Sequence, residues 1–92
     1  MPRPPRRISD LVDRPHWTVH DGRATFAPTG GGWRAVLSRL QHPDIPARYH
    51  VAIVDRTGTT RFASEAASLA DAVHGAERGV LARNALRLVP RA

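Results

Sequence analysis

The sequence has 92 residues and contains neither cysteine nor lysine. The absence of cysteine excludes disulfide bonds, thiolate metal ligands and a cysteine nucleophile. Apolar stretches are short, and none approaches the roughly 20 residues that a membrane-spanning helix needs. The N-terminus lacks the apolar stretch of a secretory signal peptide, so we expect a cytoplasmic protein that does not associate with membranes.

The basic residues are 14 arginines, which face eight carboxylates and give a formal net charge of +6. Because lysine codons are rich in adenine, exclusive use of arginine indicates a GC-rich genome, but it does not explain the excess of basic over acidic residues. A positive field of this size favours nucleic acid or an acidic protein surface as the partner. The length and an apolar content of 41% predict one small folded domain.

Composition divides the chain into an arm over residues 1–15, a single α+β domain over residues 16–89 and a tail over residues 90–92. The arm contains four prolines and four arginines, which predicts an extended backbone, with one short helical turn over Ile8–Val12 capped by Ser9 or Asp10. Arginine-rich arms contact phosphates in proteins that bind DNA or RNA, although a solvated tail has the same composition.

The first part of the domain is expected to be a β-hairpin over residues 16–27. Asp21-Gly22 is a strong signal for a type I′ turn, which needs positive φ at both positions. Counting outward from this turn pairs Trp17 with Phe26 and His20 with Arg23. The apolar side chains then share one face and the polar ones share the other, as in a half-buried antiparallel sheet.

A second hairpin is expected over residues 48–64, with its turn at Thr57-Gly58. This turn places Ile53 opposite Phe62 and Val54 opposite Arg61. Apolar residues fall on both faces of its first strand, which predicts a central position in the sheet.

Helices are expected after each hairpin. Trp33–Gln41 carries apolar residues at helical spacing, although an alternating strand also fits this short run. Glu65–Arg83, capped by Ser64, is expected to pack its apolar stripe on the sheet. Ala85–Val89 alternates apolar and polar residues and is expected to add a short edge strand.

A weak similarity between the two halves at a shift of 36 residues, such as Phe26 with Phe62, supports the order strand-strand-helix-strand-strand-helix. The predicted fold is therefore a small α+β domain. An antiparallel sheet of about four strands carries two helices on one face and leaves the other face free.

The free face of the predicted sheet collects polar and basic side chains: His16, Thr18, His20, Arg23, Thr25, His50, Arg56, Thr59 and Arg61. Arginine and threonine on a twisted sheet can enter the major groove, where they contact base edges and phosphates. A sheet carried by a helix is similar in architecture to AP2-like and integrase arm-binding domains, but no family motif is present. The absence of aromatic side chains for base stacking favours duplex DNA over RNA.

We therefore expect a small, basic, non-enzymatic protein that binds nucleic acid. The residues expected to contact nucleic acid are Arg3, Arg6, Arg7, Arg23, Thr25, Arg56, Thr59 and Arg61. One alternative is an inhibitor or adaptor, of the kind that phages and mobile elements encode, which binds an acidic host protein. A homodimer through the face around Ala52, Val54 and Ala63 is a further possibility.

A small ribonuclease toxin is the second alternative, with His20 or His50 as the acid–base group beside an arginine. No catalytic residue, cofactor or metal is expected. His16 and His20 lie about 13 Å apart on one strand face, which is too far to bind one metal ion directly. Thr29–Gly32 lacks the lysine and hydroxyl residue of a phosphate-binding loop, so a flexible connector is favoured.

Overall fold

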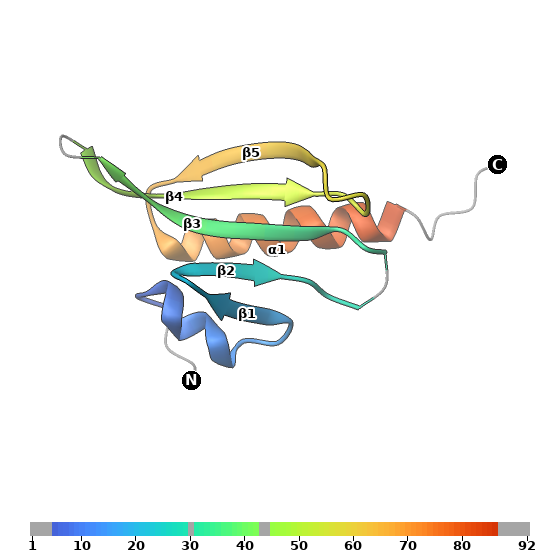
Figure 1. The fold of residues 1–92 in the computed structure, drawn as a ribbon, viewed down its shortest axis with the longest axis horizontal. Helices are drawn as coiled ribbons and strands as arrows, with labels where there is room; N and C mark the ends of the chain where they lie inside the picture. Colours follow the sequence, from blue (N-terminus) through green and yellow to red (C-terminus); the bar gives the residue numbers. More distant parts are fainter. Residues whose placement is uncertain (1–4, 30, 43–44, 87–92) are drawn as a thin grey trace.

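The computed structural model describes residues 5–29, 31–42 and 45–86. In these residues the strands form one antiparallel sheet in their sequence order, and one α-helix packs on it (Figure 1). The elements in chain order are the 3-10 helix η1 (Ile8–Asp13), strands β1 (Trp17–His20), β2 (Arg23–Phe26), β3 (Arg34–His42), β4 (Ile45–Val54) and β5 (Thr60–Ala66), and helix α1 (Leu69–Leu86). The small α+β class is confirmed, whereas the predicted numbers and order of strands and helices need correction.

Two local predictions near the N-terminus are confirmed. The expected helical turn is present as η1, in the tighter 3-10 form, but the predicted cap is wrong, because Ser9 and Asp10 lie inside η1 and Arg7 occupies the cap position. The first hairpin has the expected register, with Trp17 opposite Phe26 and His20 opposite Arg23. Asp21 and Gly22 have φ values of 51° and 74°, as a type I′ turn requires.

The helix predicted over Trp33–Gln41 is wrong, because this segment forms β3 in the middle of the sheet. The nine-residue strand pairs with β2 on one side and β4 on the other. Ala35 and Leu37 are fully buried on one face, which is the alternation of a strand. The apolar residues fit both periods over so short a run, and backbone pairing on both sides decides the outcome. The hairpins are therefore joined by a strand rather than a helix.

The second hairpin has the predicted pair of Ile53 with Phe62, but a bulge changes the register next to it. Val54 lies opposite Thr60 rather than Arg61. The Oδ1 atom of Asp55 accepts hydrogen bonds from the backbone N–H groups of Thr57 and Thr59 at 2.9 and 3.1 Å. This side chain shapes the turn, and the extra residue appears as the bulge.

Helix α1 begins at Leu69, later than the predicted start at Glu65, because β5 extends to Ala66. The cap is Ser68, whose Oγ accepts a hydrogen bond from the backbone N–H of Asp71 at 3.1 Å. The edge strand predicted over Ala85–Val89 is wrong for its first two residues, which belong to α1. The remainder of that prediction lies outside the described residues.

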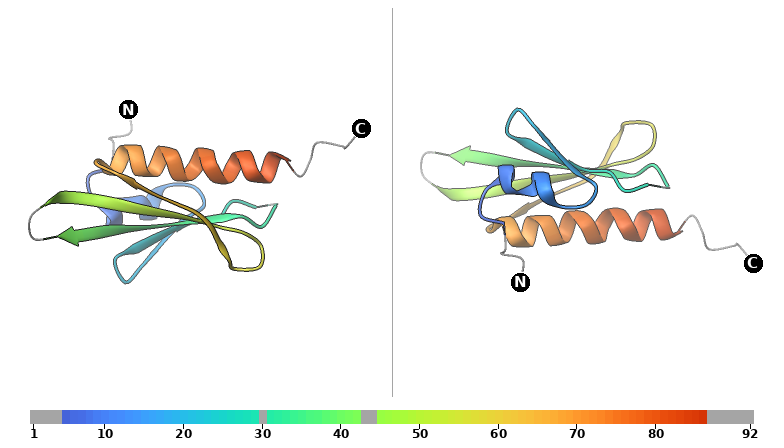
Figure 2. Two further views of the ribbon diagram at one scale, coloured as in Figure 1. Left: turned by 90° about the horizontal axis from the view of Figure 1, so that it is seen from above. Right: turned by 90° about the horizontal axis from the view of Figure 1, so that it is seen from below.

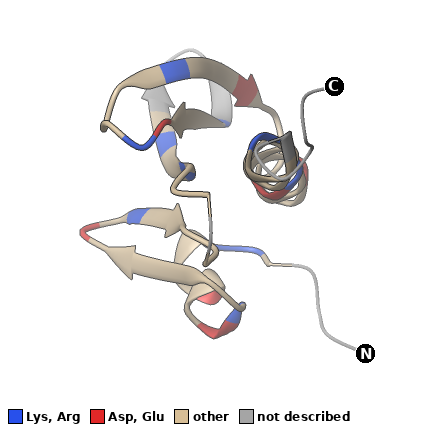
Figure 3. Cartoon of the chain, turned by 90° about the vertical axis from the view of Figure 1, so that its right-hand side faces the viewer, with Lys and Arg blue, Asp and Glu red and all other residues tan. Residues whose placement is uncertain are grey.

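The core lies on one side of the sheet, where α1 packs on β3, β4 and β5 and η1 packs on β1 and β2 (Figure 2). The apolar stripe of α1 is the predicted one, with Leu69, Val73, Ala76 and Val80 all buried. Leu11 of η1 is also fully buried in this core. Seen end-on, α1 lies beside one face of the sheet, and no described element covers the other face (Figure 3).

Glu77 of α1 joins the helix to the N-terminal segment. Its carboxylate accepts two close hydrogen bonds from Nη2 of Arg14, at 2.9 and 3.0 Å, and a longer one from Nε at 3.3 Å. The indole N–H of Trp17 donates to the same carboxylate at 2.8 Å. A charge-assisted, forked pair of this kind fixes geometry as well as adding stability. It therefore holds η1 and β1 against α1.

We predict that Glu77→Ala lowers the free energy of unfolding by about 2 kcal/mol, because the indole N–H and the guanidinium lose their acceptor. In a domain of this size the melting temperature falls by roughly 10 °C, measured by circular dichroism. Arg78→Ala, at the neighbouring exposed position, is the control and leaves the melting temperature nearly unchanged. Equal melting temperatures for the two variants would contradict this role of Glu77.

Candidate functional site

We call the sheet face opposite α1 the open face. Strand pairing arranges its side chains in rows that cross the sheet. One row is Thr18, Thr25, Val36, Ala52 and Ala63, and the next is His20, Arg23, Ser38, His50 and Glu65. Both rows are made of small, polar or charged residues. Aromatic residues instead pack on the α1 side, where Trp17 and Phe26 belong to the core.

Arg23 and Thr25 lie on the open face, as predicted. Arg23 begins β2 and is exposed, with Ser38 of β3 directly opposite it. Thr25 is half-buried opposite Val36. The two predicted site residues on this strand are therefore available on the uncovered side of the sheet.

Arg56, Thr59 and Arg61 gather around the β4–β5 turn, so they do not continue the row that contains Arg23. The Oγ1 atoms of Thr57 and Thr59 lie 3.0 Å apart within the turn. Nη1 of Arg61 is 3.9 Å from the carboxylate of Asp55. The predicted residues of the second hairpin are thus brought together with each other, at the opposite end of the open face from Arg23.

Arg34 is a basic residue of the open face that the sequence interpretation missed. It begins β3 opposite Val54 and is half-buried. The prediction of a helix over this segment hid Arg34. The alternation of Arg34, Val36 and Ser38 with the buried residues Ala35 and Leu37 was the signal for a strand. Arg34 extends the open face toward the β4–β5 turn.

The arm starts on the other side of the sheet. Arg3 lies outside the described residues, whereas Arg6 and Arg7 are exposed and directly precede η1, which lies on the same side of the sheet as α1 (Figure 2). Oδ2 of Asp10 accepts hydrogen bonds from the backbone N–H groups of Arg6 and Arg7, each at 3.1 Å. These hydrogen bonds lower the pKa of Asp10 below its usual value. The base of the arm is therefore held in place by one ionised side chain.

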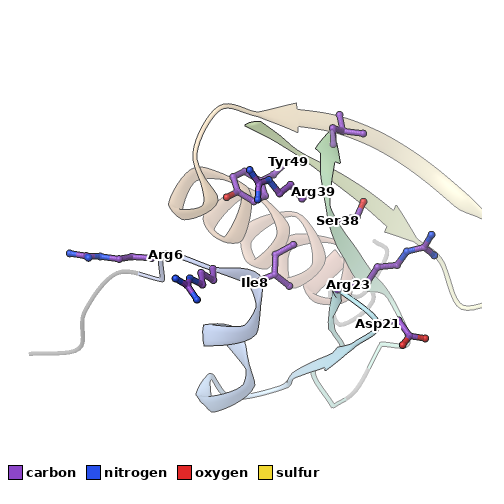
Figure 4. Close-up of a pocket in the computed structure, with 10 residues that line it drawn as sticks. Arg6, Ile8, Asp21, Arg23, Ser38, Arg39 and Tyr49 are labelled. Atoms are coloured by element: carbon purple, nitrogen blue, oxygen red, sulfur yellow. The ribbon is translucent and has the colours of Figure 1, made fainter. Parts of the chain in front are cut away.

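A hollow of about 630 Å³ lies at the N-terminal end of β2, beyond which β3 continues. Its lining includes four arginines, together with the hydroxyl groups of Ser38 and Tyr49; the arginines are Arg6, Arg7, Arg23 and Arg39. Arg6 and Arg39 extend on one side of the sheet, and Arg23 extends on the other (Figure 4). The hollow therefore connects the open face with the arm around the end of β2.

Ion pairs divide the arginines into two groups. The carboxylates of Asp55, Glu65 and Glu77 pair with arginines, and Asp21 pairs with His20. The second group consists of arginines with no carboxylate within 4 Å in the part of the chain that the structure describes. These are Arg6, Arg7, Arg23, Arg34, Arg39, Arg56, Arg78 and Arg83. Most of this second group borders the open face, the hollow or the arm.

The histidines of the open face do not converge. His20 and His50 share a row but are three strand spacings apart, about 14 Å. Among the described residues, no three histidine, aspartate or glutamate side chains are grouped so that they could hold a metal ion.

The hydrogen bonds of the β4–β5 turn can be tested through the pKa of Asp55. The Thr57 hydroxyl donates to Asp55 at 2.6 Å and is the main cause that lowers the pKa of this carboxyl below 3.8. A lowered folded-state pKa stabilises the turn above about pH 4, and this stabilisation is lost as the pH falls through the folded value. We predict that Thr57→Val raises the pKa of Asp55, measured by carboxyl NMR titration. Thr60→Val is the control, and an equal effect of both would contradict the assignment.

Comparison of the chain with models of known protein families, with curated protein sequences and with solved structures gives no match. The helices in the described residues include none long and apolar enough to cross a membrane. Arguments about function therefore rest on the open face, the hollow and the arm.

Proposed function

We propose that this chain binds nucleic acid, with duplex DNA as the favoured form, and that it does so without catalysis. The observation that carries the proposal is the open face. Arg23 and Arg34 lie there without a carboxylate partner on a surface that no described element covers. Free guanidinium groups on an accessible sheet are suited to phosphates and guanine edges.

The dimensions of the open face suit a groove of the duplex. Strands β2, β3 and β4 are adjacent, so their centres span about 10 Å, and the major groove is about 12 Å wide. Arg23 lies opposite Ser38, four residues along β3 from Arg34, so the two arginines are about 13 Å apart along the strands. One arginine at each end of a three-strand surface can contact both backbones or the base edges between them.

Side-chain composition supports duplex over single-stranded nucleic acid. Proteins that bind single strands stack bases on exposed aromatic rings. In this chain Trp17 and Phe26 are buried on the α1 side, and Trp33 and Tyr49 pack against the same core. Phe62 is exposed, but it faces the α1 side and not the open face. The open face instead presents threonine, serine and arginine, which recognise backbones and groove edges.

The arm and the hollow extend the surface beyond the groove. A backbone that leaves the open face at Arg23 meets the hollow at the end of β2, and beyond it Arg6 and Arg7. Arginines that contact phosphates in this way add affinity without sequence preference. Arg56, which has no described carboxylate partner, is available for the backbone at the opposite end of the open face.

The ribonuclease alternative places one histidine beside an arginine, and His20 does lie opposite Arg23. General acid–base cleavage needs two groups that reach one phosphate, and His20 and His50 are about 14 Å apart. An acidic protein partner needs the same free arginines as DNA does, and no described feature favours it. The two are separated by the salt dependence and duplex-length dependence of binding.

We predict that the protein binds a labelled 25-base-pair duplex with an affinity that falls steeply with salt, as measured by fluorescence anisotropy. Arg23→Ala and Arg34→Ala each weaken binding about fivefold and reduce the salt slope by about one unit. Arg78→Ala removes the same charge from the exposed side of α1 and is the control. Equal losses for all three variants would show that only net charge acts, and no binding at low salt would overturn the proposed function.

A second prediction concerns the arm. Asp10→Ala releases the backbone of Arg6 and Arg7, whereas Asp13→Ala removes the same charge from η1 without removing any hydrogen bond that the structure shows. Both variants gain one unit of net positive charge, so long-range electrostatics alone strengthen binding equally. We expect Asp10→Ala to bind the duplex at least threefold more weakly than Asp13→Ala, because the arm is no longer positioned. Equal affinities, with both variants folded by circular dichroism, would contradict a positioned arm.

A further inference from the structure

The outer edge of β5 is open. On its inner side β5 pairs with β4, and on its outer side it is the last strand of the sheet (Figure 1). Within the described residues no backbone hydrogen bond reaches that outer side, and the side chains from Thr60 to Glu65 are all exposed. The opposite edge strand, β1, has only four residues and packs against η1. An open edge of seven residues is a ready surface for another strand.

We propose that the β5 edge pairs antiparallel with β5 of a second copy of this chain, centred on Ala63, to form a homodimer. The inference is independent of nucleic-acid binding. It also differs from face-to-face association through Ala52, Val54 and Ala63, because the contact uses backbone groups at the edge. Val54 is only 6% exposed in the single chain, so the open face has little apolar surface to offer there.

The geometry of a β-sheet limits how β5 can pair with itself. Residues directly opposite each other must face the same side of the sheet. The two-fold axis must therefore lie between the two copies of one residue, which are directly opposite each other. Centring on Ala63 places Arg61, the extra residue of the bulge, opposite Glu65 of the second copy. Centres at Arg61 or Glu65 place like charges together, and centres at Phe62 or Ser64 leave both charges without a direct partner. Only one register is therefore self-complementary.

The side chains of Arg61 and Glu65 are available to form ion pairs between the two copies. In the single chain Arg61 lies 3.9 Å from Asp55, and Glu65 lies 3.8 Å from Arg48. Both contacts are long for an ion pair, and the side chains of Arg61 and Glu65 are 58% and 51% exposed. Pairing across the edge gives each of them a directly opposite partner of the other sign.

Phe62 gives a second, independent reason to propose the dimer centred on Ala63. It is 47% exposed although it faces the α1 side, where the guanidinium of Arg83 lies 4.2 Å from the ring centroid and covers part of it. In a dimer centred on Ala63 the two Phe62 rings are diagonal neighbours across the axis, within reach of each other. An exposed aromatic ring becomes covered, and the two open faces become one continuous surface.

The first test exchanges the charges. The full-length wild-type chain is expected to be a concentration-dependent dimer in sedimentation equilibrium. Arg61→Glu and Glu65→Arg should each weaken the dimer about tenfold or more, because two equivalent pairs become repulsive. The double variant Arg61→Glu with Glu65→Arg restores both pairs and should return to within about threefold of the wild type. Arg78→Glu controls for the change in net charge, and melting temperatures show that each variant is folded.

The second test uses the lack of cysteine in the chain. In the proposed register the two Ala63 residues lie directly opposite, with Cα atoms about 4.5–5.5 Å apart, which suits a disulfide bond. Ala63→Cys should therefore form a covalent dimer under mild oxidation. Ala70→Cys, equally exposed on α1, should remain mostly monomeric and is the control.

Three results would overturn the proposal. The first is a wild-type monomer at about 0.2 mM protein. The second is a dimer that both single charge variants leave unchanged. The third is a dimer that Ala52→Arg abolishes while Ala63→Cys fails to cross-link, since that dimer would use the open face. A dimer with charge-swap rescue and selective cross-linking supports the β5 edge, whether or not the protein binds DNA.

Discussion

The carboxylate of Glu77 is the contact on which the layered arrangement depends. It accepts hydrogen bonds from Arg14 and Trp17, which precede it by some sixty residues, and so ties η1 and β1 to α1. Leu11 is the one buried residue of η1, and Trp17 is buried in β1. With the carboxylate in place, η1 and α1 together cover one face of the sheet. Among the described residues, no element packs on the other face of the sheet.

Because one face of the sheet is covered and the other is not, the arginines have different roles on the two sides. Arg14 and Arg83 act within the structure, one by pairing with Glu77 and the other by covering Phe62. Arg23 and Arg34 have no such role and lie on the uncovered face. Part of the positive charge is therefore carried by described arginines that pair with no described carboxylate. Free arginines on an accessible sheet are the physical basis for proposing a polyanionic partner.

Features set by short-range chemistry could be predicted from the sequence. Asp21-Gly22 determined the register of the first hairpin, and the apolar stripe of α1 identified its buried face. The segment that became β3 could not be assigned in this way, because its apolar residues fit a helix and a strand equally. Hydrogen bonding to β2 and β4 decides between them, and that pairing is not local. The same error hid Arg34 and Arg39, so the candidate site was predicted only in part.

The bulge beside Arg61 shows a second limit of sequence interpretation. A two-residue turn at Thr57-Gly58 predicts regular pairing, but hydrogen bonds to the Asp55 side chain favour a different turn. Side-chain contacts of this kind depend on the three-dimensional path of the backbone and have no fixed signature in spacing. The position of Arg61 follows from that turn, and so does its place on the β5 edge.

The most direct test of the central claim is an NMR titration of the isotope-labelled protein with a short duplex. If the open face binds DNA, amide and arginine side-chain signals of Arg23, Arg34 and their neighbours on β2–β4 shift progressively, while those of Arg78 on the exposed side of α1 do not. Shifts spread evenly over all exposed arginines, or confined to α1, would contradict the account.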